Sequence, residues 1–68
     1  MKNVLLRFDS LLNLWCFKEK AQLNQVEIIP KQNLLISELS DGQVTMAVGH
    51  YNAEILALHH FYPTINKN

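Results

Sequence analysis

The chain has 68 residues, which leaves room for only one small hydrophobic core. It contains a single cysteine, Cys16. One cysteine excludes an internal disulfide and a cysteine-rich zinc site within one chain. A core from so short a chain rarely supplies more than about 3 to 5 kcal/mol without a disulfide, a metal or a partner chain. We therefore expect one domain over residues 1–62 that gains stability by self-association, followed by a polar, flexible tail over residues 63–68.

The composition is that of a globular protein. Apolar residues make up 49% of the chain and six acidic side chains balance six basic ones, which argues against disorder. No apolar run approaches the roughly 20 residues that span a bilayer. The apolar start is interrupted by Arg7, Asp9 and Asn13 and lacks a small-residue cleavage site, so it does not match a secretory signal. We expect a cytoplasmic protein without membrane contact.

The first third of the chain predicts a strand followed by a helix. Residues 4–8 alternate between a uniformly apolar side and a mixed side, which is strand periodicity. Asp9 or Ser10 can cap a helix that runs from residue 11 to about residue 23, and Asn24 can end it in a left-handed conformation. The apolar side chains at helical spacing are Leu11, Leu14, Trp15, Phe17 and Ala21.

A hairpin is predicted next. Residues 26–29 are rich in β-branched side chains and residues 34–39 read as another strand. Between them, residues 30–33 have turn chemistry, because Pro30 fixes φ and Asn33 tolerates a positive φ. The two strands are therefore expected to pair antiparallel.

Residues 41–51 have the most regular helical spacing in the chain. Ser40 or Asp41 can cap this helix and Asn52 can end it. Alternatively, Asp41 and Gly42 could form a tight hairpin turn, a common role of this dipeptide. We favour the helix because its apolar residues recur at i, i+3, i+4 and i+7. These residues are Val44, Ala47, Val48 and Tyr51.

With a last strand over residues 53–58, the elements occur in the order βαββαβ. Two strand–helix–strand units with right-handed crossovers place both helices on one face of a four-stranded antiparallel sheet. This order resembles the ferredoxin-like fold over about residues 3–60. The fold carries many unrelated functions, so the resemblance does not select one.

The sheet face away from the helices is predicted to be too apolar for full solvation. If Val4, Leu6 and Phe8 face the helices, alternation sends Leu5 and Arg7 to the other face. By the same rule the second strand sends Glu27 and Ile29 there. The register of the last two strands is open: the third strand contributes either Leu35 or the pair Leu34 and Ile36, and the fourth either Ile55 and Ala57 or Leu56 and Leu58.

A contiguous apolar face in so short a chain indicates a partner, and the simplest partner is a second copy. We therefore predict a homo-oligomer, most simply a dimer; another protein partner is the alternative. The aromatic stretch after the last strand is expected to contribute, because large amphipathic rings are enriched at interfaces. The candidate interface residues are Leu5, Arg7, Glu27, Ile29, Leu35, Phe61 and Tyr62.

Catalysis, cofactor binding and nucleic-acid binding are not expected. Asp9, Ser10, Ser40 and Asp41 are assigned to helix capping rather than to a catalytic pair. RNA-binding proteins of the resembled fold carry aromatic residues on central strands and a basic surface, whereas residues 34–39 contain no aromatic residue and the net charge is zero.

Metal binding has weak support in the sequence. Zinc and copper favour imidazole and thiolate ligands, but adjacent residues of one strand point to opposite faces, so at most one of His59 and His60 can join a given cluster. Cys16 is expected in the core. We predict a non-catalytic, self-associating interaction module; the alternative is a small-ligand or metal-binding module with a site between subunits, to which His50, His59, His60 or Cys16 could contribute.

Overall fold

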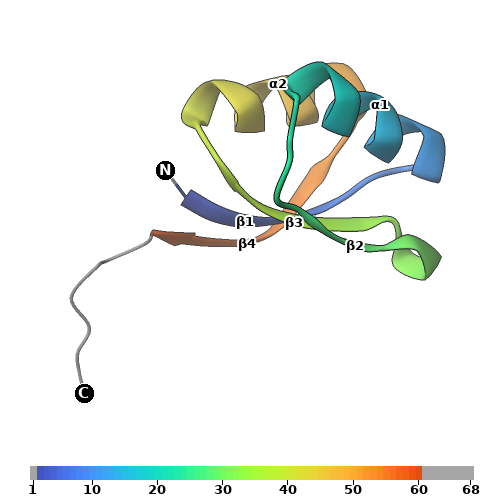
Figure 1. Ribbon diagram of the computed structural model, residues 1–68, viewed down its shortest axis with the longest axis horizontal. Helices are drawn as coiled ribbons and strands as arrows, with labels where there is room; N and C mark the ends of the chain where they lie inside the picture. The colour runs from blue at the N-terminus through green and yellow to red at the C-terminus, as the bar shows by residue number, and fades with distance from the viewer. Residues whose placement is uncertain (1, 61–68) are drawn as a thin grey trace.

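The computed structural model describes residues 2–60, and within them it has two α-helices on one face of a four-stranded antiparallel sheet (Figure 1). The strand order across the sheet is β2-β3-β1-β4, so the predicted ferredoxin-like α+β fold is confirmed. Phe61, Tyr62 and the predicted tail lie outside the described residues. The elements are β1 (Lys2–Arg7), α1 (Leu11–Ala21), β2 (Glu27–Ile29), the 3-10 helix η1 (Pro30–Gln32), β3 (Leu34–Leu39), α2 (Asp41–Tyr51) and β4 (Glu54–His60).

Serine side chains start both α-helices. Ser10 Oγ accepts a hydrogen bond from the Asn13 amide at 3.1 Å. At α2, Ser40 Oγ accepts from the Gln43 amide at 3.2 Å, and the Gln43 side-chain oxygen accepts from the Ser40 amide at 2.9 Å. This reciprocal capping box satisfies two amides that the first turn leaves unpaired. It explains why the residues after Ser40 begin a helix and not a hairpin turn.

Residues in the left-handed region end both α-helices and η1. Asn33 and Asn52 have φ of 56° and 57°, as their residue type favours. The end of α1 differs from the prediction, because Gln22 and not Asn24 has the positive φ of 56°. The Gln22 and Leu23 amides donate to the carbonyls of Glu19 and Lys18, the pattern of a Schellman motif. This turn sends Leu23 into the core, and burial of its side chain favours the earlier end.

The core lies between the sheet and the two helices. Phe17 of α1 packs against Phe8 at a ring distance of 5.6 Å and against Tyr51 of α2 at 5.8 Å. The Asn13 side-chain amide donates to the Tyr51 carbonyl at 3.4 Å, which ties the helices together. The buried cluster consists of Val4, Leu6, Phe8, Leu14, Phe17, Leu23, Leu35, Leu39, Ala47 and Ala53.

Some helix side chains that the spacing predicts to be buried are exposed. Val48 was expected in the buried stripe of α2 but is 42% exposed, and Cys16 of α1 was expected in the core but is exposed. The helical spacing of apolar residues predicted a wider buried stripe on each helix than the part of the helix that packs against the sheet and the other helix. On α2 only Ala47 is fully buried, with Val44, Met46 and Tyr51 half-buried beside it.

The capping box predicts a specific loss of stability. Ser40→Ala should lower the free energy of unfolding by about 1 kcal/mol, because it leaves a first-turn amide without its side-chain acceptor. The measurement is equilibrium urea denaturation. Thr45→Ala, at an exposed position within α2, is the matched control and should not destabilise the domain. Equal destabilisation by the two variants would contradict the capping role.

Neighbouring positions on α2 should respond oppositely to a charge. Ala47→Asp places an unpaired carboxylate in the core and should cost about 3 to 5 kcal/mol, comparable with the whole stability of so small a domain. Val48→Asp should be tolerated, because the side chain reaches water. Thermal melts monitored by circular dichroism distinguish the two. A loss of folding in Val48→Asp would show that the exposed side of α2 is wrongly assigned.

Candidate functional site

The candidate interface is the open face, defined as the sheet surface that lies away from both helices. Residues directly opposite each other on paired strands share a face, so the register identifies its members. One row across the sheet is Glu27, Ile36, Leu5 and Ala57, and the next is Ile29, Leu34, Arg7 and Glu54. Asn3 and Glu38 face each other in a third row. The open face therefore comprises Asn3, Leu5, Arg7, Glu27, Ile29, Leu34, Ile36, Glu38, Glu54 and Ala57.

The centre of the open face is apolar and the described part of its rim is polar. Leu5, Ile36 and Ala57 are half-buried by their neighbours, and Ile29 at the β2 edge is exposed. Leu34, opposite Arg7 and Ile29, is only 8% exposed. Glu27, Glu38 and Glu54 lie toward the rim, and all three are exposed. An apolar centre with a polar rim is the usual layout of a protein interface.

The structure places four of the predicted interface residues, Leu5, Arg7, Glu27 and Ile29, on the open face, as alternation indicated. The prediction of Leu35 as an interface residue is wrong. Leu35 lies opposite Leu6 on the helix side and its exposed fraction is 0%. The β1–β3 register therefore selects the other alternative, in which Leu34 and Ile36 take the open-face positions.

A β-bulge in β4 makes both predicted alternatives for this strand partly wrong. Leu5 pairs with Ala57 but Leu6 pairs with Ile55, so Leu56 is left without a partner on β1. The extra residue reverses the alternation. Ala57 consequently lies on the open face, whereas Ile55 and Leu58 lie on the helix side. Simple alternation along a sequence cannot locate such a bulge.

Electrostatics on the open face involve one ion pair. The Arg7 guanidinium lies 2.5 Å from a Glu54 carboxylate oxygen, across the β1–β4 boundary. Both side chains are more than half exposed, and an exposed pair contributes only about 0 to 1 kcal/mol. On the helix side, Lys2 pairs with Asp41 at the start of α2. The Arg7–Glu54 pair mainly neutralises one edge of the apolar centre.

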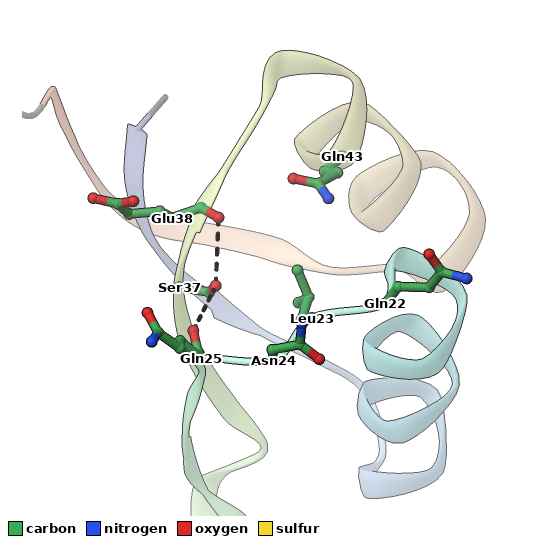
Figure 2. Close-up of a pocket in the computed structure, with 7 residues that line it drawn as sticks. All are labelled: Gln22, Leu23, Asn24, Gln25, Ser37, Glu38 and Gln43. Atoms are coloured by element: carbon green, nitrogen blue, oxygen red, sulfur yellow. Dashed lines mark hydrogen bonds between the residues drawn. The ribbon is translucent and has the colours of Figure 1, made fainter.

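A second feature is a polar hollow of about 540 Å³ between the loop that follows α1, β3 and the first turn of α2 (Figure 2). The buried Ser37 hydroxyl lies 3.3 Å from the Gln25 carbonyl and 3.4 Å from the Glu38 carbonyl, and donates to these backbone oxygens. In Figure 2 the Glu38 carboxylate and the Gln25 amide point away from the hollow. Its lining residues are Gln22, Leu23, Asn24, Gln25, Ser37, Glu38 and Gln43.

This hollow has no catalytic arrangement. Its lining contains no histidine, lysine or arginine that could activate the Ser37 hydroxyl or bind an anion. The Gln43 side-chain oxygen is already used in the capping box. The hollow can therefore offer hydrogen bonds to a neutral polar molecule, but it lacks a nucleophile and base pair.

Two smaller hollows are lined mainly by residues of α1 and α2. One is lined by Trp15, Cys16, Glu19, Lys20 and Tyr51, and another by Lys20, Met46, His50 and Tyr51. The exposed Cys16 lines the first hollow and His50 lines the second, and both hollows share Lys20 and Tyr51. Among the side chains that the structure describes, which exclude those of His59 and His60, no group of three or more histidine, cysteine or acidic side chains is arranged to hold a metal ion.

Neither described helix has the length and apolar character needed to cross a membrane. Compared with models of known protein families, with curated proteins and with solved structures, the chain matches none of them. The functional argument therefore rests on the surfaces described above.

Proposed function

We propose that the chain is a non-catalytic interaction module that associates with a second copy of itself through the open face. The observation that carries this proposal is the uncovered apolar centre, which runs across all four described strands. Contiguous apolar patches on small soluble proteins commonly mark partner surfaces. A twofold axis through the patch makes one surface self-complementary, so a second copy is the simplest partner.

The small core supports the same proposal. Ten buried residues form it, and α2 contributes only one of them, Ala47. Association adds burial that such a core cannot provide within one chain. We place the module in the cytoplasm, where the exposed thiol of Cys16 would stay reduced.

The size of the open face sets the expected strength of association. The strands lie about 4.8 Å apart; three of them are six or seven residues long and β2 has three residues, which gives a flat area of roughly 350 Å². A standard interface buries about 800 Å² on each partner. The open face alone should therefore give a weak assembly with a micromolar Kd, which dissociates on dilution.

Leu5→Glu should weaken the assembly, because it places a carboxylate at the centre of the open face where two copies meet. The half-exposed side chain can still reach water in a free subunit, so the domain stays folded. The measurement is sedimentation velocity on the untagged protein at about 100 µM and about 1 µM, above and near the expected Kd.

Leu12→Glu is the matched control for this test. Leu12 is the most exposed large apolar residue of the described chain, at 71%, and lies on α1 away from the open face. The control should retain the parent's sedimentation. If Leu5→Glu also leaves the sedimentation unchanged, the open face is not the contact surface.

A second candidate function, binding of a small neutral ligand, has the polar hollow as its specific support. Native mass spectrometry of the protein as purified checks it. The proposed interaction module should appear as a bare multimer. A retained mass that is lost in Gln43→Leu, but kept in the exposed Gln32→Leu variant, would instead favour the ligand-binding function.

A further inference from the structure

The polar hollow exists because β2 is shorter than the strand with which it pairs. Glu27 begins β2 opposite Ile36, so residues 37–39 of β3 pair with β1 but not with β2. The segment between α1 and β2, residues 22–26, runs beside this part of β3, and the first turn of α2 completes the walls (Figure 2). The volume of about 540 Å³ lies within the range of small-molecule sites, which is about 300 to 1,000 Å³.

The wall that contains Ser37 has more hydrogen-bond acceptors than donors. Ser37 Oγ lies 3.3 Å from the Gln25 carbonyl oxygen and 3.4 Å from the Glu38 carbonyl oxygen. A hydroxyl has one hydrogen, so it can donate well to only one of these carbonyls at a time. No described residue donates to Ser37 Oγ itself, although Ser37 is only 6% exposed. This wall is therefore complementary to a bound molecule that supplies donors.

The wall that contains Gln43 has the opposite requirement. The Gln43 side-chain oxygen accepts from the Ser40 amide at 2.9 Å in the capping box, which fixes the orientation of the side-chain carboxamide. The nitrogen of that carboxamide keeps two hydrogens and has no acceptor among the described residues. In Figure 2 this nitrogen faces the hollow. This wall is therefore complementary to a bound molecule that supplies an acceptor.

The lining does not suit an ion. Among the described residues that line the hollow only Glu38 is ionised, and its carboxylate points away from the hollow in Figure 2. An anion would have no positive side chain to neutralise it, and a cation would have no acceptor for the Gln43 nitrogen. Gln22 and Asn24 are exposed and uncharged, and Leu23 offers an apolar contact. The bound molecule should be neutral, with donors at one end and an acceptor at the other.

We propose that the polar hollow binds the primary carboxamide group of a small neutral molecule. A primary carboxamide has an NH2 group with two donors and a carbonyl acceptor on the same carbon. Its NH2 group donates to Ser37 Oγ and to the carbonyl, of Gln25 or Glu38, that the Ser37 hydroxyl leaves free. Its carbonyl accepts from the Gln43 nitrogen. This proposal rests on the second candidate function, whose ligand class it names, and not on association through the open face.

Propionamide is the probe, because it is a primary carboxamide with a short alkyl chain that can contact Leu23. The measurement is a two-dimensional NMR titration of the nitrogen-15-labelled protein with about 1 to 50 mM propionamide, since so small a molecule should bind with a millimolar Kd. Saturable shifts are expected at the main-chain amides of Ser37 and Glu38 and at the side-chain NH2 group of Gln43.

Two close relatives of the probe test which of its groups are recognised. N,N-Dimethylpropionamide keeps the carbonyl but has lost both donors. Propionate has the same shape as propionamide, but a charged oxygen replaces the NH2 group. Both should bind about tenfold more weakly than propionamide, because each leaves the acceptors around Ser37 without a donor.

Gln43→Glu tests the donor at the other end of the hollow. A glutamate here keeps an oxygen for the Ser40 amide, so the capping box and α2 stay intact, but the NH2 group is lost. The variant should bind propionamide about tenfold more weakly. It should also bind propylammonium, which has donors and no acceptor, more tightly than the parent does. Gln32→Glu, the same change at an exposed position of η1, is the matched control and should keep the parent's affinity for both probes.

Three results would overturn the carboxamide site. One is a lack of saturable shifts up to about 50 mM propionamide, well above a millimolar Kd, which would mean that the hollow holds only water. Another is equal binding of propionate and propionamide, which would show that the hollow does not select an amide. The third is a Gln43→Glu variant with the parent's affinity for propionamide.

The results also separate this proposal from the open-face contact. If propionamide binds as expected but Leu5→Glu leaves the parent's sedimentation unchanged, the open-face contact is wrong and the carboxamide site stands. If Leu5→Glu weakens the assembly but propionamide gives no saturable shift, the carboxamide site is wrong and the open-face contact stands.

Discussion

The pairing of β1 with β3 determines most of this structure. These two central strands place Leu6 opposite Leu35 and Val4 opposite Ser37, and this register fixes which side chains enter the core and which reach the open face. A slip of one residue would exchange Leu35 for Leu34 and Ile36 and so reverse the two faces of β3. The helices reinforce the register, because Phe17 and Leu14 can be buried only against the face that carries Val4, Leu6 and Leu35. Core formation and the composition of the open face are therefore consequences of one set of strand contacts.

Local chemistry could be predicted well from the sequence, because its causes lie within a few residues. Ser10 and Ser40 cap the helices, and Asn33 adopts the left-handed conformation in the turn. The residue at which α1 ends was harder to predict, because it depends on the burial of Leu23 against residues that are distant in the sequence. The prediction that Val48 is buried was wrong for a related reason. Periodicity gives the side of α2 on which Val48 lies but not how far the sheet extends beneath it.

The residues of the open face could be predicted on β1 and β2, where polar and apolar residues alternate. The prediction failed on β3 and β4, where the sequence allows more than one register. Leu5, Arg7, Glu27 and Ile29 follow from alternation on β1 and β2 alone. Every residue of β3 except Ser37 and Glu38 is a leucine or isoleucine, so its two faces look alike in the sequence, and Leu35 was placed on the wrong one. On β4 the run Ile55 to Leu58 is apolar throughout and hides the bulge. Continuous apolar runs erase the signal that alternation provides.

The apolar run in β4 has a physical consequence beyond its ambiguity in the sequence. A strand buried on both faces would explain it, since such strands read as uninterrupted apolar runs. Yet β4 is an edge strand among the described residues, and its apolar residues are exposed on the helix side and at the bulge. The side chains of β4 thus have the composition of a central strand in the position of an edge strand.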